Sequence, residues 1–88
     1  DIGTWDTLYG TLPKDTDGNV IMQSHTLMNS SHDNVISLPK GKLAVIQDVN
    51  DLLIADVGNV LLICKKGKEG DIRKFLNDAR MKYGDEFV

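Results

Sequence analysis

The sequence has little cysteine, no large cluster of cations and no uninterrupted apolar run, and each shortage excludes a class of protein. Its one cysteine, Cys64, rules out a disulfide within the chain and fits a reducing compartment. Cys64 ends an apolar run. We therefore interpret it as a small buried hydrophobic residue rather than as a reactive thiol.

Positive charge is scarce in most of the chain. Residues 1–64 carry three lysines and eight aspartates, whereas residues 65–88 carry seven lysines or arginines interleaved with five acidic residues. The acidic body argues against a nucleic-acid partner, because phosphate binding needs clustered cations. The mixed charges of the last part are typical of a solvated helix face.

The apolar stretch at residues 43–63 is interrupted by polar side chains. These are Gln47, Asp48, Asn50, Asp51 and Asp56. A membrane-spanning helix needs about 20 predominantly apolar residues, so we expect no membrane segment here. With 88 residues, 41% of them apolar, the chain predicts one small folded domain, which we expect to be cytoplasmic.

Motifs for nucleotide binding and nucleophilic catalysis are missing from the sequence. It has no Walker loop, dinucleotide fingerprint or nucleophile elbow. His25 and His32 lie seven residues apart with only Asp33 close by. A metal site needs three or four convergent ligands, so we interpret both histidines as surface or turn residues.

The segment Asp-Thr-Asp-Gly-Asn at residues 15–19 has a faint likeness to a calcium-binding loop. An EF-hand with its glycine at Gly18 would need an acidic residue at Pro13 and a glutamate at Ser24. The spacing therefore favours a plain turn over a calcium site.

Six short β-rich runs occupy the middle of the chain and are separated by turn residues. They lie at 20–23, 26–28, 34–38, 42–47, 51–56 and 59–64. No gap is long enough for a crossover helix, so the runs predict an all-β core of coils or a small stacked sheet. The last two runs are apolar at successive positions, which predicts strands covered on both faces.

Helical periodicity marks both ends of the chain. Near the start, one stripe contains Ile2, Trp5, Leu8, Tyr9 and Leu12, and Pro13 ends it. Trp5 and Tyr9 could form a ligand platform, but on such a helix we expect them in the core.

A second helix is predicted at about residues 68–83, with Gly84 as its stop signal. Its apolar face contains Ile72, Phe75, Leu76, Ala79 and Tyr83. We expect this face to pack on the chain's own sheet, with partner binding as the alternative.

Asp1 allows two interpretations. An aspartate at the start of a helix is a favourable N-cap. Its carboxylate could also hold a divalent cation, since Mg²⁺ sites use one or two carboxylates together with substrate phosphates. The composition of the chain leaves both open.

The opening segment DIGTWDTLY resembles the Asp-[Ile/Val]-Gly-[Ser/Thr]-Trp-x-x-Leu segment of mannose-1-phosphate guanylyltransferases, and Asp-Thr-Asp-Gly-Asn-Val at 15–20 resembles a turn of the same family. GKLAVIQDVNDLLIADVGNVLLIC at 41–64 and the helix DIRKFLNDAR extend the resemblance over nearly the whole chain. The sequence departs from the family at Gln47, where glycine is frequent, and at residues 56–60, and it matches poorly over 23–34.

The resemblance implies that the chain is the C-terminal part of a larger enzyme, which fits the absence of an initiator Met. Residues 1–13 would end a nucleotidyltransferase domain. Residues 14–88 would form a small domain that resembles a left-handed β-helix and is closed by the terminal helix. The implied fold class is mainly β with flanking helices. A phosphomannose isomerase domain follows this region in some family members, and Val88 does not show whether one follows here.

The resemblance also implies a parent enzyme that converts GTP and α-D-mannose 1-phosphate to GDP-mannose and diphosphate. Asp1 would help to bind Mg²⁺ in the intact enzyme only. This fragment lacks the Gly-rich nucleotide loop, so we expect it to contain no catalytic or cofactor-binding residue and to be inactive alone. Its role would be structural, in a homodimer and in packing on its own nucleotidyltransferase domain to support the active site. The alternatives are a free-standing assembly module and a pyrophosphorylase for another sugar nucleotide.

Overall fold

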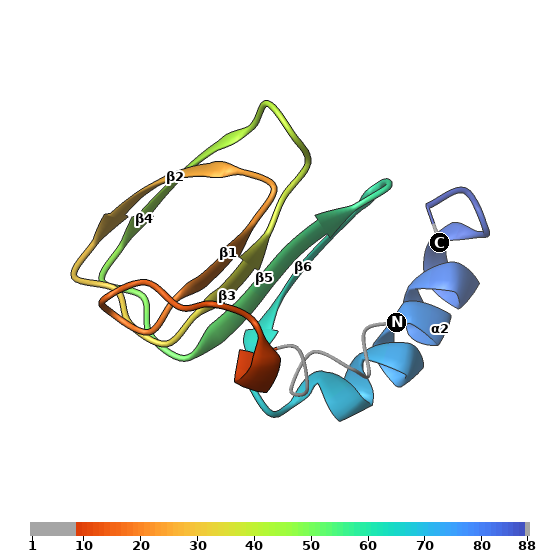
Figure 1. Cartoon of the computed structure of the whole chain (residues 1–88). Coiled ribbons are helices and arrows are strands. Elements are labelled where there is room, and N and C mark those ends of the chain that lie inside the picture. The colour runs from red at the N-terminus through yellow and green to blue at the C-terminus, as the bar shows by residue number, and fades with distance from the viewer. Residues whose placement is uncertain (1–8, 88) are drawn as a thin grey trace.

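The fold is a short stack of β coils followed by a helix. The computed structural model describes residues 9–87. Its elements, in chain order, are β1 (Val20–Met22), β2 (His25–Asn29), β3 (Val35–Ser37), β4 (Leu43–Gln47), β5 (Leu52–Val57), β6 (Val60–Lys65), the 3₁₀ turn η2 (Glu69–Asp71) and α2 (Ile72–Tyr83) (Figure 1). All six predicted strands are confirmed to within one residue at each end. The terminal helix predicted at about 68–83 ends at Tyr83 as expected, but its α-helical part begins only at Ile72, after the η2 turn.

The strands pair in parallel between successive coils. β1 lies beside β3 and β3 beside β5, while β2 lies beside β4 in a separate two-stranded sheet. Val20 is level with Val35, and Val35 with Leu53, so one coil takes 15 residues and the next takes 18. The additional residues fall at the corner between β3 and β4, around the exposed Pro39–Gly41 segment.

Residues with left-handed backbone conformation turn the corners of the coils. Gly18, Asp33 and Asp51 occupy the same corner in successive turns, with φ of 82°, 62° and 61°. Aspartate tolerates this region better than most residues because its short polar side chain can bond locally. At the first of these positions a Cβ would collide with the Asp33 carboxylate, so glycine is favoured at Gly18 by space as well as by backbone conformation.

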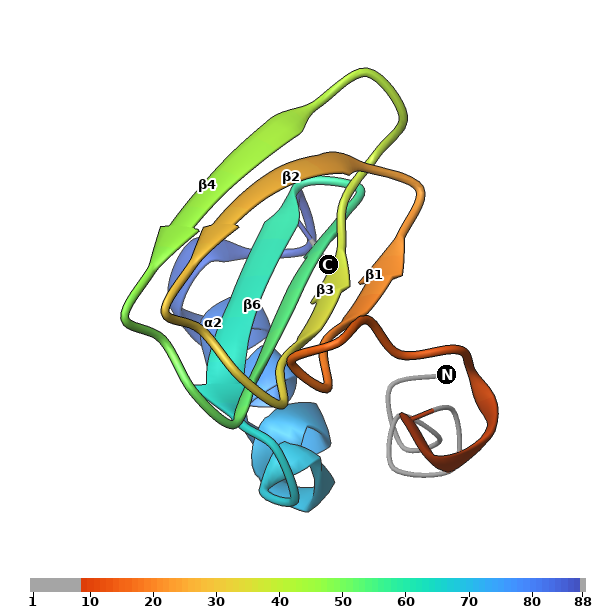
Figure 2. The same ribbon diagram turned by 60° about the vertical axis from the view of Figure 1, so that its left-hand side comes forward.

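The four-stranded sheet has the order β1-β3-β5-β6 and separates two other layers. The β2–β4 sheet lies on one side of it and α2 on the other, as the views in Figures 1 and 2 both show. β6 runs antiparallel to β5 after a tight hairpin at Gly58, where φ is 60°. The hairpin replaces a third parallel coil.

The main hydrophobic cluster is built on one face of the four-stranded sheet. Its buried members are Val20, Val35 and Leu53, and the partly buried residues packed on them are Tyr9, Leu12, Met22, Leu62 and Cys64. Because successive strand residues point to opposite faces, the fully buried Ile36 points the other way, into the coil. The sheet is therefore covered on both faces where the coils are complete.

One expectation about the strands is wrong for β6. Leu61 and Ile63 are 62% and 59% exposed, so only one face of this strand is covered. The two-stranded sheet that faces the four-stranded sheet ends at β4. It therefore leaves no strand to face β6 among the described residues. The same expectation holds for β5, where Leu53 and Ala55 are buried and Ile54 is half-buried.

The first predicted helix falls largely outside the described residues. Residues 9–11 are helical, and Tyr9 packs on the main cluster as expected. Asp1, Ile2, Trp5 and Leu8 lie outside the described residues. Over residues 9–87, no helix has the length and apolar character needed to cross a membrane.

Candidate functional site

Two buried asparagines form a ladder inside the coils. The Asn19 side-chain amide donates to the Ser31 carbonyl at 2.9 Å, and that of Asn34 donates to the Val49 carbonyl at 2.7 Å. The Asn19 Oδ1 in turn accepts from the Asn34 backbone N–H, and the Asn34 Oδ1 accepts from the N–H of Leu52, both at 2.9 Å. Each side chain thus closes its own coil and joins it to the next one.

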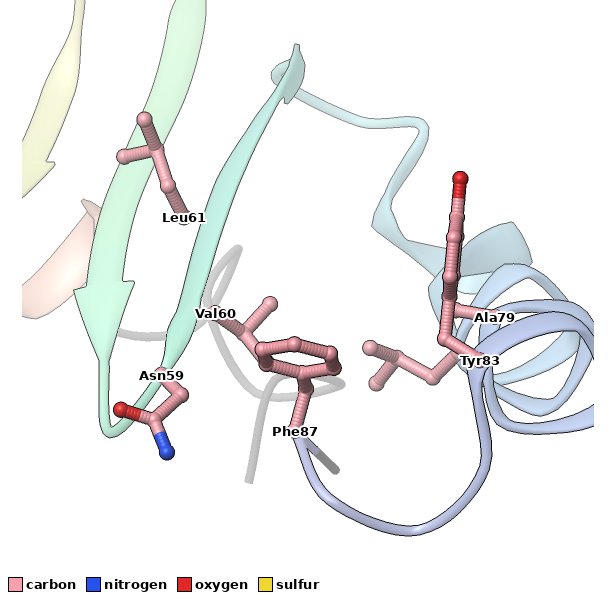
Figure 3. A pocket seen from close by; sticks show the side chains of 7 residues that line it. Asn59, Val60, Leu61, Ala79, Tyr83 and Phe87 are labelled. Atoms are coloured by element: carbon pink, nitrogen blue, oxygen red, sulfur yellow. The ribbon is translucent and has the colours of Figure 1, made fainter.

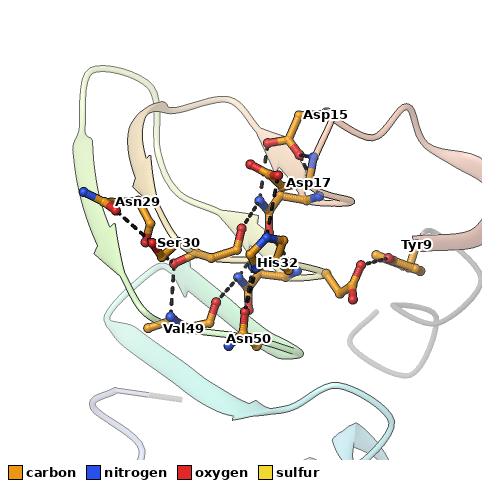
Figure 4. A network of polar contacts seen from close by, with 12 residues as sticks. Tyr9, Asp15, Asp17, Asn29, Ser30, His32, Val49 and Asn50 are labelled. Atoms are coloured by element: carbon orange, nitrogen blue, oxygen red, sulfur yellow. Dashed lines mark hydrogen bonds and ion pairs between the residues drawn. The ribbon is translucent and has the colours of Figure 1, made fainter.

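A second stack of polar side chains lies on the outside of the coils, near the corner formed by Gly18, Asp33 and Asp51. His32 donates its backbone N–H to the Asn50 Oδ1 at 2.9 Å, and its Nδ1 lies 3.1 Å from the same oxygen (Figure 4). The His32 Nε2 lies 3.7 Å from the Asp17 carboxylate in the coil below. These side chains are exposed, and His25 is exposed on β2, which confirms both histidines as surface or turn residues. Among residues 9–87, no group of three His, Cys, Asp or Glu side chains could hold a metal ion.

The segment at 15–19 is a plain turn, as the spacing predicts. The Asp15 carboxylate accepts from the backbone N–H groups of Asp17 and Asn19, each at 2.9 Å. The Gly18 N–H donates to the Asp15 carbonyl at 3.0 Å. The carboxylate is thus used in shaping the first corner of the β-helix.

Tyr9 is fixed against this corner by contacts of three kinds. Its ring packs on the main cluster, and its hydroxyl donates to the Gly18 carbonyl at 3.1 Å. The Lys66 Nζ lies 3.4 Å from the ring centroid, and the Lys14 Nζ lies 4.6 Å from it. An ammonium group over an aromatic ring is attracted by the negative face of the π system.

Lys66 is itself held in place by the corners of the coils. Its Nζ donates to the Asp33 carbonyl at 2.6 Å and lies 3.5 Å from the Asp51 carboxylate. The side chain is only 15% exposed, which is unusual for lysine. Lys66 therefore links Tyr9 to two successive coils.

An apolar groove lies between the β5–β6 hairpin and α2. Its volume is about 400 Å³, and its lining consists of Asn59, Val60, Leu61, Leu76, Ala79, Tyr83 and Phe87 (Figure 3). The apolar face of α2 points to its own sheet, as expected, but does not close on it. Phe75 and Tyr83 remain more than half exposed. With one amide and no charged group in its lining, the groove suits apolar contact rather than catalysis.

Cys64 is partly buried rather than buried, and it contacts other hydrophobic residues as a small hydrophobic side chain would. It packs on the main cluster, where burial raises the pKa of its thiol above 9.0, and the nearby charge of Glu69 raises it further. A thiol that stays protonated at neutral pH is a poor nucleophile. The Glu69 carboxylate is itself buried, and neither of its oxygens has a hydrogen-bond partner among the described residues.

The sequence analysis did not identify Asn19, Asn34 and Lys66 as the residues that hold the coils together. Asn19 and Asn34 both stand in the tripeptide Asn-Val-Ile, which recurs after 15 residues and marks equivalent positions of two coils. That repeat is a signal that could have identified them. Lys66 has no comparable signal, because it stands among other basic residues and its partners are distant in sequence.

Together the described residues define a two-coil β-helix-like domain closed by a hairpin and a helix. Its buried asparagines shape the coils, and apolar side chains are exposed on the β2–β4 sheet, β6 and α2.

Comparison with known proteins confirms the resemblance read from the sequence. No family model matches the chain. The alginate biosynthesis protein AlgA of Pseudomonas aeruginosa is 26% identical over 78 residues, which cover 89% of this chain and 16% of that protein. The crystal structure titled mannose-1-phosphate geranyltransferase, from Thermus thermophilus, has the same fold, with a TM-score of 0.74 at 20% identity. This match covers 90% of the chain and 24% of the solved one, so the chain spans less than a quarter of either protein's length.

Proposed function

We propose that this chain is the C-terminal domain of a nucleotidyltransferase that makes GDP-mannose and diphosphate from GTP and mannose 1-phosphate. The similarity to AlgA over 89% of the chain carries the proposal. The opening segment at residues 1–9, which resembles that of mannose-1-phosphate guanylyltransferases, adds the substrate class. The parent would be a cytoplasmic enzyme.

The role of the domain in that enzyme would be structural. Its buried asparagines Asn19 and Asn34 are engaged in the coils, and its groove is apolar, so these features suit packing rather than catalysis. These surfaces suit contact with the preceding nucleotidyltransferase domain and with a second copy in a homodimer. The assignment of Asp1 as a Mg²⁺ ligand stays a prediction of the resemblance, since Asp1 lies outside the described residues.

The test is GDP-mannose synthesis by the full-length parent, with and without residues 14–88. We expect the truncated enzyme to lose most of its activity and, in light scattering, to lose its dimer. The 88-residue chain alone, mixed with GTP, mannose 1-phosphate and Mg²⁺, should form no GDP-mannose. Full activity in a monomeric truncated enzyme would contradict the structural role, and an inactive full-length parent would contradict the family assignment.

An assembly module unrelated to catalysis is the second candidate. The observation that favours it is a set of exposed apolar side chains on the β2–β4 sheet, namely Leu27, Leu43 and Val45. The coding sequence upstream of Asp1 separates the two candidates: a Gly-rich nucleotide loop there supports the nucleotidyltransferase, and an unrelated domain supports the assembly module. Assay of the parent with other sugar phosphates and nucleotides tests the remaining alternative, a pyrophosphorylase of different specificity.

A further inference from the structure

Tyr9 contacts parts of the chain that are far apart in sequence. Its hydroxyl bonds to Gly18 and lies 3.5 Å from the Asp33 carboxylate, so it touches the same corner of two coils. Its ring meets Lys66, which follows β6 and precedes α2. One side chain therefore ties the start of the described chain to the coils and to the link between sheet and helix.

The Tyr9–Lys66 contact differs from an ordinary surface pair. On α2, the Lys82 Nζ lies 5.3 Å from the centroid of the Tyr83 ring, and the Tyr83 side chain is largely exposed. The Nζ of Lys66 is closer to its ring, at 3.4 Å, and two coils hold it there through Asp33 and Asp51. A cation–π contact is worth more when it is desolvated, so the buried pair has the larger effect.

The position of Tyr9 in the chain gives this contact its importance. Under the proposed function, the polypeptide reaches the β-helix from the nucleotidyltransferase domain through residues 1–13. Tyr9 is in this stretch, and its backbone is helical where the described structure begins. A rigid hold on Tyr9 fixes the direction in which the chain enters the β-helix.

We propose that Tyr9 and Lys66 form a latch that sets the orientation of the preceding domain relative to the β-helix. They are positioning residues, because neither has a reactive role and both act through the backbone that connects the domains. This inference rests on the proposed function for the identity of the preceding domain. The latch itself can be tested in the 88-residue chain.

The first test is amide hydrogen exchange of the 88-residue chain, followed residue by residue. Replacing Lys66 by Met keeps the side-chain stem but removes the ammonium group from the ring. We expect exchange at residues 9–12 to accelerate about fivefold, whereas exchange in β3 stays unchanged. Tyr9→Phe, which removes only the hydroxyl, should give a smaller acceleration at the same residues.

The control is Lys82→Met, which removes the matching surface contact on α2. It should leave exchange at residues 9–12 unchanged. The proposal is overturned if Lys66→Met has no effect on residues 9–12, or if it accelerates β3 to the same extent, since the second result would mean general destabilisation. The conservative Tyr9→Phe variant keeps the question answerable if Lys66→Met fails to fold.

The second test uses the full-length parent. In small-angle scattering, Lys66→Met should enlarge the radius of gyration and broaden the distribution of distances between domains, while Lys82→Met should change neither. An unchanged arrangement in the active parent would overturn the latch and leave the proposed function standing. Loss of GDP-mannose synthesis in the unmodified parent would instead overturn the proposed function, and the exchange result would still decide whether the latch exists.

Discussion

Asn34 is the side chain on which the internal polar bonds of the coils converge. It is fully buried, donates to the Val49 carbonyl and to the Asn19 Oδ1, and accepts from the Leu52 N–H. A buried polar group that loses its partner costs the desolvation free energy that was spent on it. The residue therefore stabilises the coils through the groups that it satisfies as well as through its own packing.

Replacing Asn34 by Ala should lower the free energy of unfolding by about 2 kcal/mol, because two partly buried backbone groups lose their partners. Urea denaturation followed by circular dichroism measures this loss. Asn29→Ala is the control, since Asn29 is exposed and its side chain bonds to the neighbouring Ser30 hydroxyl. A similar loss of unfolding free energy in both variants would show that the buried asparagine ladder stabilises the fold no more than a surface hydrogen bond does.

The thiol of Cys64 should affect stability at alkaline pH. Burial and then the charge of Glu69 raise its pKa above 9.0, so the folded chain holds this proton more tightly than the unfolded chain. The associated stability is present below pH 9.0 and is lost as the pH rises through the folded pKa. The unfolding free energy of the native chain should therefore fall relative to that of Cys64→Ala above pH 9.0. Parallel pH profiles for the two proteins would exclude this linkage.

The strands were predictable because turn residues mark their ends. Gly58 directly follows β5, and Asp33 and Asp51 stand just before β3 and β5, so turn residues make the limits of these strands visible in the sequence. Which strands pair with each other was harder to predict, because the two coils differ in length and the sequence has no constant repeat length. The exposure of Leu61 and Ile63 depends on where the facing sheet ends, which no local pattern encodes.

The terminal helix depends on one deeply buried anchor. Ile72, at its first turn, is 5% exposed, whereas Phe75 on the same helix is 56% exposed. Ile72→Ala should lower the free energy of unfolding by about 2–4 kcal/mol, because it removes buried methyl groups and leaves a cavity. Phe75→Ala should lower it by less than about 1 kcal/mol. Thermal and urea unfolding of the two variants measure the difference, and equal losses would mean that the helix is held along its whole face.

Among residues 9–87, apolar side chains are exposed on α2 and on two separate surfaces of the sheets. One surface, formed by Leu61 and Ile63, lies on β6 where the facing sheet has ended. The other, formed by Leu27, Leu43 and Val45, lies on the outside of the β2–β4 sheet. Exposed apolar patches of this kind mark contact sites, so we expect the 88-residue chain to self-associate.

Charge substitutions on each surface should identify the contact. We expect Leu61→Asp combined with Ile63→Asp to give a monomer in sedimentation experiments, because no facing strand covers this side of β6 among the described residues. Leu27→Asp combined with Val45→Asp should leave self-association largely intact. The reverse result would place the contact on the β2–β4 sheet, and a native chain that stays monomeric at high concentration would exclude both.

The unequal lengths of the two coils show where this architecture tolerates change. The longer coil accommodates its additional residues at Pro39–Gly41, which is exposed, and apart from the adjoining residues no atom lies within 4 Å of where a Gly41 side chain would begin. The strands on either side keep their parallel pairing despite the different length. Lengthening a surface loop costs little, since the closure entropy grows only slowly with loop length. This corner is therefore where an epitope or a reporter peptide could be inserted into the β-helix without unpairing a strand.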